Sequence, residues 1–278
     1  MHWLKPFLVC SKFGIIIGVT FFFLLLFPIA RLHAQVNIQG KPGLMFIPDA
    51  SFEKDQFGLS FSNVPEAYAI NYFMFGFYPE NYISVRAGIL PFLEVNFTIT
   101  RLEGMADRIG IGDRHLDMRL HLLKEKEQFP SIVLILYPPF GSANYIDHNA
   151  LTMSKTYTLT GPWQFSPTLG YGLPYFIGLP PNSKDKSLSE RLKFRKKADY
   201  NNYYLNGFFG GAKFHHEKFG GLMAEYDSRT VNLGGFVKLG KTLILQGHLM
   251  DFNSLSFTGS FSMSLNKAPY EWRRHEKE

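Results

Sequence analysis

Cysteine is almost absent from this chain of 278 residues, because Cys10 is the only one. It lies near the N-terminus, next to a long apolar stretch, so the rest of the chain can form no disulfide and offers no thiol for catalysis. Lipid attachment after removal of a leader would need a cysteine at the first mature position, where this chain has Gln35. Disulfide scaffolds, thiol enzymes and lipoproteins are therefore excluded.

Long hydrophobic runs are also missing, apart from one of 18 residues at 13–30. Two lysines precede this run and the small Ala34 follows it, which is the pattern of a secretory signal peptide. We therefore expect residues 1–34 to be removed, with cleavage between Ala34 and Gln35. The alternative is an uncleaved anchor, since a run of this length nearly spans a bilayer. Pro28 interrupts the run close to its end and favours cleavage.

A large excess of charge is missing as well. The formal net charge of the whole chain is +6. The expected leader contains no acid and three basic residues, Lys5, Lys12 and Arg31, so the mature chain would carry about +3. Such a small excess is not typical of a nucleic-acid-binding protein. Aromatic residues make up 16% of the chain and it contains 25 glycines, a combination that favours β structure.

Helical periodicity is absent too, because no 3.6-residue pattern lasts longer than about two turns. Polar and apolar residues instead alternate, as in LEVNFTIT (93–100) and LSFTGSFSMSL (255–265). Alternation places one polar and one apolar face on each strand. Turn-forming residues separate the runs, and we predict roughly 10–14 antiparallel strands. The predicted organisation is a signal peptide at 1–34, one β-domain at 35–266 and a charged tail at 267–278.

Two all-β architectures fit this alternation, a soluble sandwich and a transmembrane barrel. Strands of 7 to 10 residues approach the roughly 9–11 that a tilted bilayer crossing needs. Aromatic residues collect at strand ends, at 68–82 and 201–209, as interfacial girdles would. The polar face is rich in Ser, Thr, Asn and Gly and poor in Lys and Glu, which suits an enclosed lumen. We therefore predict a single antiparallel transmembrane β-barrel.

The stretch GIGDRHLDMRLHLL (110–123) resembles an active site at first sight, but alternates strictly from residue 116 onward. One face carries Asp117, Arg119 and His121, and the other carries Leu116, Met118, Leu120 and Leu122. Asp117 and Arg119 are two residues apart on the same face, so we expect them to pair along the strand. Such a row would set the polarity of the lumen for a glycan, or hold the barrel shut. The predicted polar lumen row is Glu94, Asp113, Arg114, Asp117, Arg119 and His121.

A basic segment at 180–202 is the one shift in composition. It is expected to be a solvated loop, or to contact phosphates of lipopolysaccharide or an acidic glycan. Its basic residues are Lys184, Lys186, Arg191, Lys193, Arg195, Lys196 and Lys197.

Motifs for catalysis, metals and cofactors are missing. The chain has no G-x-S-x-G nucleophile elbow and no H-E-x-x-H helix. His215 and His216 are adjacent, so on a strand they would face opposite ways and could not easily share a metal. We predict no catalytic residue, no cofactor and no metal.

Several motifs between residues 40 and 175 resemble the YjbH family of Gram-negative outer-membrane proteins linked to exopolysaccharide production. They are the opening GLMFIPDASF…FGLSFS, the strand LEV, the motif GIGDR-x-LD, the strand end LL-x-E and the strand LTMSKTY. One departure is PPFGSANYIDHNALTMSK (138–155), where the family has a stretch rich in glycine and threonine. The resemblance implies an outer-membrane β-barrel that acts in the production or export of an extracellular polysaccharide.

We therefore predict a non-catalytic outer-membrane β-barrel that acts in exopolysaccharide or capsule production or export. Its expected partners are outer-membrane lipid, polysaccharide or lipopolysaccharide, and envelope secretion proteins. Two alternatives remain open at this point. One is an outer-membrane lipid-modifying enzyme, a lipase or deacylase, and the other is a soluble periplasmic carbohydrate-binding β-sandwich.

Overall fold

The computed structural model describes residues 35–52, 56–70, 76–104, 112–138, 146–179 and 187–265. The predicted signal peptide (1–34) and the charged tail (267–278) lie outside the described residues.

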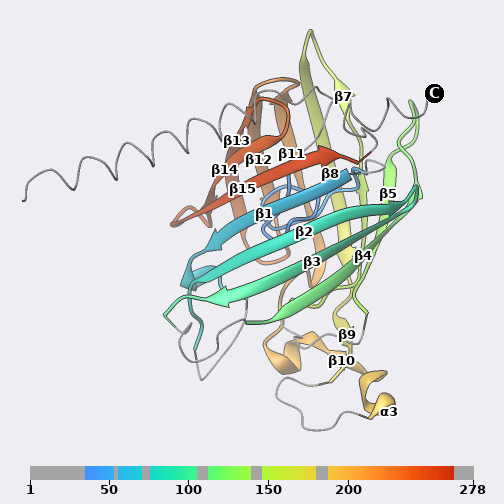
Figure 1. Cartoon of the computed structure of the whole chain (residues 1–278), viewed down its shortest axis with the longest axis vertical. Coiled ribbons are helices and arrows are strands. Elements are labelled where there is room, and N and C mark those ends of the chain that lie inside the picture. Colours follow the sequence, from blue (N-terminus) through green and yellow to red (C-terminus); the bar gives the residue numbers. More distant parts are fainter. Residues whose placement is uncertain are drawn as a thin grey trace, which may run out of the picture. The chain divides into compact units, whose positions relative to one another are not determined.

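Twelve antiparallel strands of the described chain close into a barrel (Figure 1). Each strand pairs with the next, β8 pairs with β11, and the last strand returns to pair with the first along Gln56↔Ser264 to Asn63↔Phe257. The prediction of a single antiparallel barrel is confirmed, and the alternative of a β-sandwich is wrong. The strands are β1 (Gln56–Val64), β2 (Glu80–Leu90), β3 (Leu93–Leu102), β4 (Arg114–Leu123), β5 (Ser131–Leu136), β6 (Ala150–Ser154), β8 (Trp163–Gly172), β11 (Gly207–His216), β12 (Gly220–Tyr226), β13 (Val231–Leu239), β14 (Leu243–Met250) and β15 (Ser254–Ser264).

Short elements complete the described fold. Strand β7 (Tyr157–Thr158) lengthens the hairpin that leads into β8, and β9 (Tyr175–Ile177) pairs with β10 (Phe194–Lys196) outside the barrel. Helix α3 (Leu188–Arg191) precedes β10, and two 3-10 turns are present, η1 (Glu66–Tyr68) and η2 (Lys197–Tyr200). Among the described residues, no helix is long and apolar enough to cross a membrane.

Alternation along the strands gives the barrel an apolar outside and a largely polar inside. The inside carries buried Ser, Thr, Asn and charged side chains, whereas large apolar side chains are exposed around the outside. An exposed apolar belt around a closed barrel is the surface that lipid covers in transmembrane β-barrels. Outward side chains include Leu59, Phe61, Ile83, Phe97, Leu116, Leu151, Leu169, Phe214, Leu222, Leu233, Val237, Leu245 and Phe257.

Connections at the two rims differ in length. Short turns join β2 to β3, β11 to β12 and β13 to β14, and we call this end the short-turn rim. The four long connections join β1 to β2, β3 to β4, β5 to β6 and β8 to β11 at the opposite end, the long-loop rim, where short turns also join β12 to β13 and β14 to β15. In bacterial barrels, the short turns face the periplasm and the long loops face the exterior.

The segment before β1 lies inside the barrel. All residues from 35 to 50 are buried, and Figure 1 shows this segment in blue, enclosed by the strands. We call residues 35–50 the plug. Their burial accounts for three tyrosines that the sequence placed in interfacial girdles: Tyr68, Tyr82 and Tyr204 are buried in one apolar cluster with the plug. That girdle prediction is wrong for these three residues, because the plug offers them an apolar interior to pack against.

Candidate functional site

The plug is a compact folded loop with its own hydrogen bonds. The backbone amide of Asn37 donates to the carbonyl of Lys41 at 2.7 Å, and that of Ile38 donates to the carbonyl of Met45 at 2.8 Å. Gly40 has a φ of 78°, and a Cβ there would lie 2.4 Å from the Cβ of Ser84 on the wall. Only glycine meets both demands, because other residues rarely adopt positive φ and would collide with β2. The plug thus approaches the wall backbone closely.

A buried ion pair joins the plug to β4. Lys41 Nζ lies 2.6 Å from Asp117 Oδ2, and both side chains are at least 98% buried. The same carboxylate oxygen accepts from Asn96 Nδ2 at 3.2 Å, and its other oxygen lies 3.7 Å from Nε2 of His148. A buried charge is tolerated only with a partner of opposite sign and further hydrogen bonds. Asp117 has both, so Lys41 is held at a fixed place in the lumen.

Arg119 lies at the centre of a second set of contacts. Its guanidinium lies 2.6 Å from Glu94 Oε1 and donates to the carbonyls of Asp49 at 2.8 Å and Ser51 at 2.9 Å. Glu94 Oε2 also lies 3.8 Å from Nε of Arg86. The guanidinium has several donors in a fixed plane, so it can serve a carboxylate and two carbonyls at once. This cluster attaches the end of the plug to β3 and β4.

Glu225 of β12 binds the plug from the opposite wall. Its carboxylate accepts from the backbone amides of Phe46 at 2.8 Å and Met45 at 3.0 Å, with Ile47 at 3.4 Å. A carboxylate that accepts several amides satisfies donors which would otherwise be buried without partners. Glu225 therefore holds the tip of the plug by its backbone.

Lys213 of β11 supplies a further tie to the plug. Its Nζ lies 2.5 Å from Asp49 Oδ2, and Asp49 is almost fully buried. The plug thus gives the lumen one buried cation, Lys41, and one buried anion, Asp49, and each is matched by a wall residue of opposite charge.

Apolar side chains also line part of the lumen, among the polar ones. Buried side chains of β11 to β14 pack with the apolar residues of the plug in one cluster, and a second cluster joins Ala50 to Val133 and Ile135 of β5. The polar inner face that the alternation predicts is therefore interrupted by apolar side chains where the plug packs. The apolar plug residues are Ile38, Leu44, Met45, Phe46 and Ile47, and their wall partners in the cluster include Phe209, Met223, Phe236, Ile244 and Met250.

Two inward glycines leave the space that the plug occupies. A Cβ on Gly211 would lie 2.8 Å from Cδ2 of Leu44, and one on Gly234 would lie 2.8 Å from Sδ of Met45. Both distances are shorter than real Cβ contacts, and a Cβ on Gly211 would also lie 2.5 Å from the carbonyl oxygen of Ala224, so a side chain there would collide with the neighbouring strand as well as with the plug. The wall is shaped to this segment.

The structure brings most of the predicted polar row into the lumen, but pairs it differently. Glu94, Asp117 and Arg119 are buried there, and Asp117 pairs with Lys41 rather than with Arg119. The reason is that Glu94 lies directly opposite Arg119 in the β3–β4 ladder and forms the ion pair with it. His121 is half-buried near the short-turn rim, where its ring stacks on Phe52 with centroids 4.7 Å apart.

The prediction that Arg114 belongs to the polar lumen row is wrong. This residue is exposed and lies on the same face of β4 as the outward Leu116, so it cannot line the lumen. His115 occupies the inward position instead and is buried. Asp113, one residue before the strand, is half-buried, and desolvation raises the pKa of its carboxyl to about 6 against the opposing effect of Arg114.

The predicted basic loop is only partly a free cationic surface. Lys184 and Lys186 lie outside the described residues. Lys193 and Arg195 both pair with Glu190, and Arg195 also donates to the carbonyl of Gly178 at 2.8 Å. Arg191 is half-buried and Lys196 is exposed.

Lys197 corrects the basic-loop prediction, because it is buried. Its Nζ donates to the carbonyls of Tyr204 at 2.8 Å and Leu205 at 3.3 Å. Desolvation lowers the pKa of this amine to about 7, although the nearby Asp147 acts in the opposite direction. Lys197 is therefore a structural residue that fixes the chain before β11.

Two serine–histidine contacts lie in the lumen wall, His121 with Ser131 and, at 3.5 Å, Nε2 of His215 with Oγ of Ser166. Nε2 of His121 is 2.8 Å from Oγ of Ser131, while that hydroxyl is also 2.6 Å from the carbonyl of Ala50. Within the described residues, Nδ1 of His121 has no hydrogen-bond partner, so no acid orients this ring as a catalytic triad requires. The described residues contain no group of three or more metal-ligating side chains.

The plug itself was not found from the sequence. Residues 36–50 contain glycines, prolines and one short apolar run at 44–47, a pattern typical of a loop. The signal available was a lysine and an aspartate in a short segment ahead of a barrel whose predicted inner face carries charges of both signs. Predicting the plug from this signal would have required knowing which strands face each other across the lumen.

Comparisons with known protein families and with curated proteins gave no match. Among solved structures, the chain is similar to the crystal structure of an outer membrane channel from Pseudomonas putida F1, at 15% identity over 77% of this chain and 97% of that one, with a TM-score of 0.36. A likeness of this size is too weak to assign a fold or a function, and the barrel assignment depends on the strand pairing described above.

Proposed function

We propose that this protein is a non-catalytic outer-membrane β-barrel that serves the production or export of an extracellular polysaccharide, with the plug as its closed state. The resemblance of GIGDR-x-LD and its neighbouring motifs to the YjbH family supports the polysaccharide role. The apolar belt around the barrel supports the membrane location.

One observation carries the proposal: a polar, charged wall surrounds a segment that is not part of the barrel. Buried charges such as Glu94, Asp117 and Arg119 are costly, and a barrel needed only as an anchor would be more stable with an apolar filling. Ion pairs and hydrogen bonds between plug and wall, unlike ladder pairing, can be exchanged for water or for sugar hydroxyls. The wall is therefore suited to a hydrated chain when the plug moves.

The aromatic mouth at the long-loop rim also supports a glycan ligand. A cavity of about 470 Å³ is lined there by Phe77, Tyr203, Arg229 and Glu66. The guanidinium of Arg229 lies 4.3 Å from the centre of the Tyr203 ring. Flat aromatic faces beside charged groups can contact the apolar face and the hydroxyls of a sugar.

The test is a deletion strain complemented with wild-type protein or with Asp117→Ala/Arg119→Ala. We expect deletion to lower cell-bound and released polysaccharide, and wild-type protein to restore it. The double variant leaves Lys41 without its partner and should be less stable, so export is compared at equal amounts of folded protein, judged by heat-modifiable gel migration, and we expect it to be restored only in part. Unchanged polysaccharide in the deletion strain contradicts the proposal.

The same strains separate the lipid-modifying alternative. Mass spectrometry of lipid A and phospholipids should give the same acyl chains in the deletion and wild-type strains. If acyl chains change while polysaccharide does not, the protein is an enzyme acting on lipid, and Ser131→Ala is the variant to examine next.

A further inference from the structure

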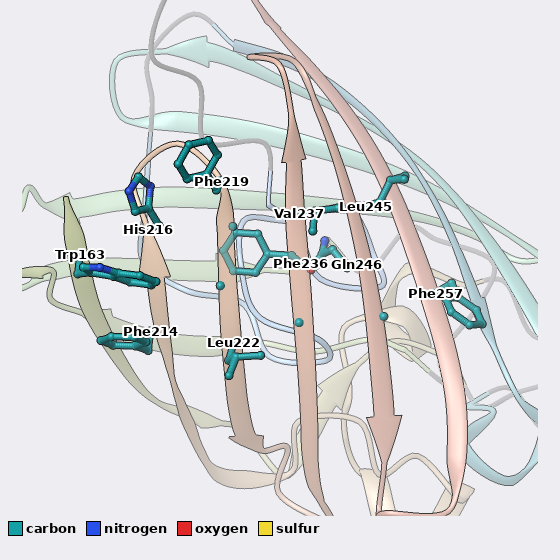
Figure 2. Close-up of a pocket in the computed structure, with 14 residues that line it drawn as sticks. Trp163, Phe214, His216, Phe219, Leu222, Phe236, Val237, Leu245, Gln246 and Phe257 are labelled. Carbon is teal, nitrogen blue, oxygen red and sulfur yellow. The ribbon is translucent and has the colours of Figure 1, made fainter.

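A groove floored by glycine lies on the lipid-facing surface of β11 to β15, toward the short-turn rim (Figure 2). Its volume is about 740 Å³, within the range of roughly 300–1,000 Å³ typical of small-molecule sites. Figure 2 shows Trp163 and Phe214 along one side and Phe257 along the other. The rings of Trp163 and Phe214 are stacked, 5.0 Å apart and inclined by 9°, so this wall is flat and apolar.

The floor of the groove is a pair of glycines that the backbone does not require. Gly235 and Gly247 are directly opposite each other across β13 and β14, and both face outward. A Cβ on Gly235 would lie no closer than 3.5 Å to any neighbour, and a Cβ on Gly247 no closer than 3.9 Å. Neither has a positive φ. This differs from Gly211 and Gly234, whose missing side chains make room for the plug.

Glycine in a strand interior lowers stability, because it adds chain entropy and packs no side chain against its cross-strand partner. A glycine pair with free space above it therefore leaves a depression that serves something other than the barrel. Most other outward positions of the belt carry large residues such as Leu, Val and Phe, and Gly259 of β15, opposite Leu245, is a further outward glycine beside the pair.

The surroundings of the groove indicate what fills it. It is continuous with the apolar belt, where the only available solvent is acyl chains. The turns that bound it at the short-turn rim carry two exposed lysines, Lys218 after β11 and Lys241 after β13, together with His216 and a single acid, Glu217. These turns face the periplasmic leaflet by the loop-length rule. Cations at that level attract the phosphate of an anionic headgroup.

We propose that this groove binds one acyl chain of an anionic phospholipid of the periplasmic leaflet, with its phosphate beside Lys218 and Lys241. The inference requires a membrane-spanning barrel but is independent of the polysaccharide role. Two terms favour this lipid over the surrounding lipid. The groove and the lipid tails are equally apolar, so the first is closer packing of the acyl chain against the groove walls. The second is the attraction between the headgroup phosphate and the lysines.

The test uses mature protein purified in dodecyl maltoside, delipidated, and titrated with phosphatidylglycerol or phosphatidylcholine under native mass spectrometry. We expect wild-type protein to bind one phosphatidylglycerol in preference to phosphatidylcholine. Filling the groove with Gly235→Leu/Gly247→Leu should weaken this binding about fivefold through lost packing contacts. The matched pair Gly235→Ala/Gly247→Ala, which leaves most of the space, should bind nearly as wild type. Lys218→Gln/Lys241→Gln should remove the preference for the anionic lipid.

Three results would overturn the proposal: no phospholipid on wild-type protein, equal binding by the leucine pair, or equal losses in the leucine and alanine pairs. Heat-modifiable migration checks that each variant is folded. A second measurement needs no variant: phosphatidylglycerol with a photoreactive acyl chain should label wild-type peptides from 214–222 and 235–247 above the rest of the belt. Even labelling around the barrel contradicts the site. Because neither readout involves polysaccharide, failure here leaves the proposed function standing, and the reverse is also true.

Discussion

At the scale of single residues, the lumen is a set of buried charges that are each compensated. Glu94 lies between two arginines, and Asp117 has Lys41 together with an amide and an imidazole. Removing one charge of a pair should lower the stability of the folded state, because the remaining buried charge has lost its hydration and no longer has a partner of opposite sign.

Lys41→Met should therefore destabilise the protein by about 3–5 kcal/mol, since it leaves Asp117 without its cation. Asp117→Asn should be destabilising as well, because Lys41 is then unpaired. The double variant should lose less than the sum of the two, which measures their coupling. Urea unfolding in detergent micelles, followed by heat-modifiable migration, gives all three values. Additive losses would show that the two side chains act independently.

Lys197 predicts a dependence of stability on pH. Its pKa is about 7 in the folded chain against an ordinary value of 10.5, so between these limits the unfolded state binds more protons. Raising the pH through this window should stabilise the folded state, by up to about 1.4 kcal/mol per pH unit. Below pH 7 the cost of burying the charged amine is present in full.

The control is Lys197→Met, which has no group to titrate at this position. Urea midpoints measured between pH 7 and pH 10 should rise in the wild type relative to this variant. Parallel curves for the two proteins would mean that the amine keeps its proton when folded.

At the scale of elements, the plug is held on two sides by different forces. Lys41 and Asp49 join it to charged wall residues, and the apolar residues from Leu44 to Ile47 pack on β11 to β14. Glu225 accepts the amides at its tip. The plug is thus fixed both by charged groups of the wall and by apolar packing.

Glu225→Ala should loosen the plug, because the amides of Met45 and Phe46 lose their acceptor at about 1–3 kcal/mol each. In planar bilayers, we expect wild-type protein to stay almost closed and this variant to show brief openings. Glu127→Ala, at an exposed position in the β4–β5 turn, is the control and should behave as wild type. If Glu225→Ala conducts no more than the control, Glu225 does not hold the lumen shut.

At the scale of the whole molecule, closure removes every free strand edge of the barrel, and the outer belt leaves a large apolar surface. Monomeric soluble proteins rarely expose an apolar surface of this kind, which is the surface that lipid covers in transmembrane barrels.

The mature chain should therefore fractionate with outer membranes and need detergent to dissolve. Unboiled samples should migrate differently from boiled samples on a gel, because a closed barrel resists unfolding by detergent at room temperature. Recovery of the mature chain as a monomer in a periplasmic extract without detergent would contradict both the barrel's membrane location and the proposals above.

The sequence alone determined the fold class and the faces of the strands. Alternation in LEVNFTIT and in residues 116–122 is local, since each side chain's direction follows from its neighbours on the same strand. For the same reason, Glu94, Asp117 and Arg119 could be placed inside from the sequence, and Arg114 could have been placed outside by extending the same alternation two residues back.

Only the tertiary structure decided what these residues contact. The partner of Asp117 is Lys41, 76 positions away, and the acceptor of the plug's amides is Glu225, about 180 positions away. Such pairs depend on which strands close the barrel and on the path of the plug, which forms no β-ladder with the wall. No local sequence pattern encodes either of these. The glycines illustrate the same difference. From the sequence alone, Gly234 and Gly235 are equivalent. Only the closed barrel shows that Gly234 faces the plug and that Gly235 faces outward.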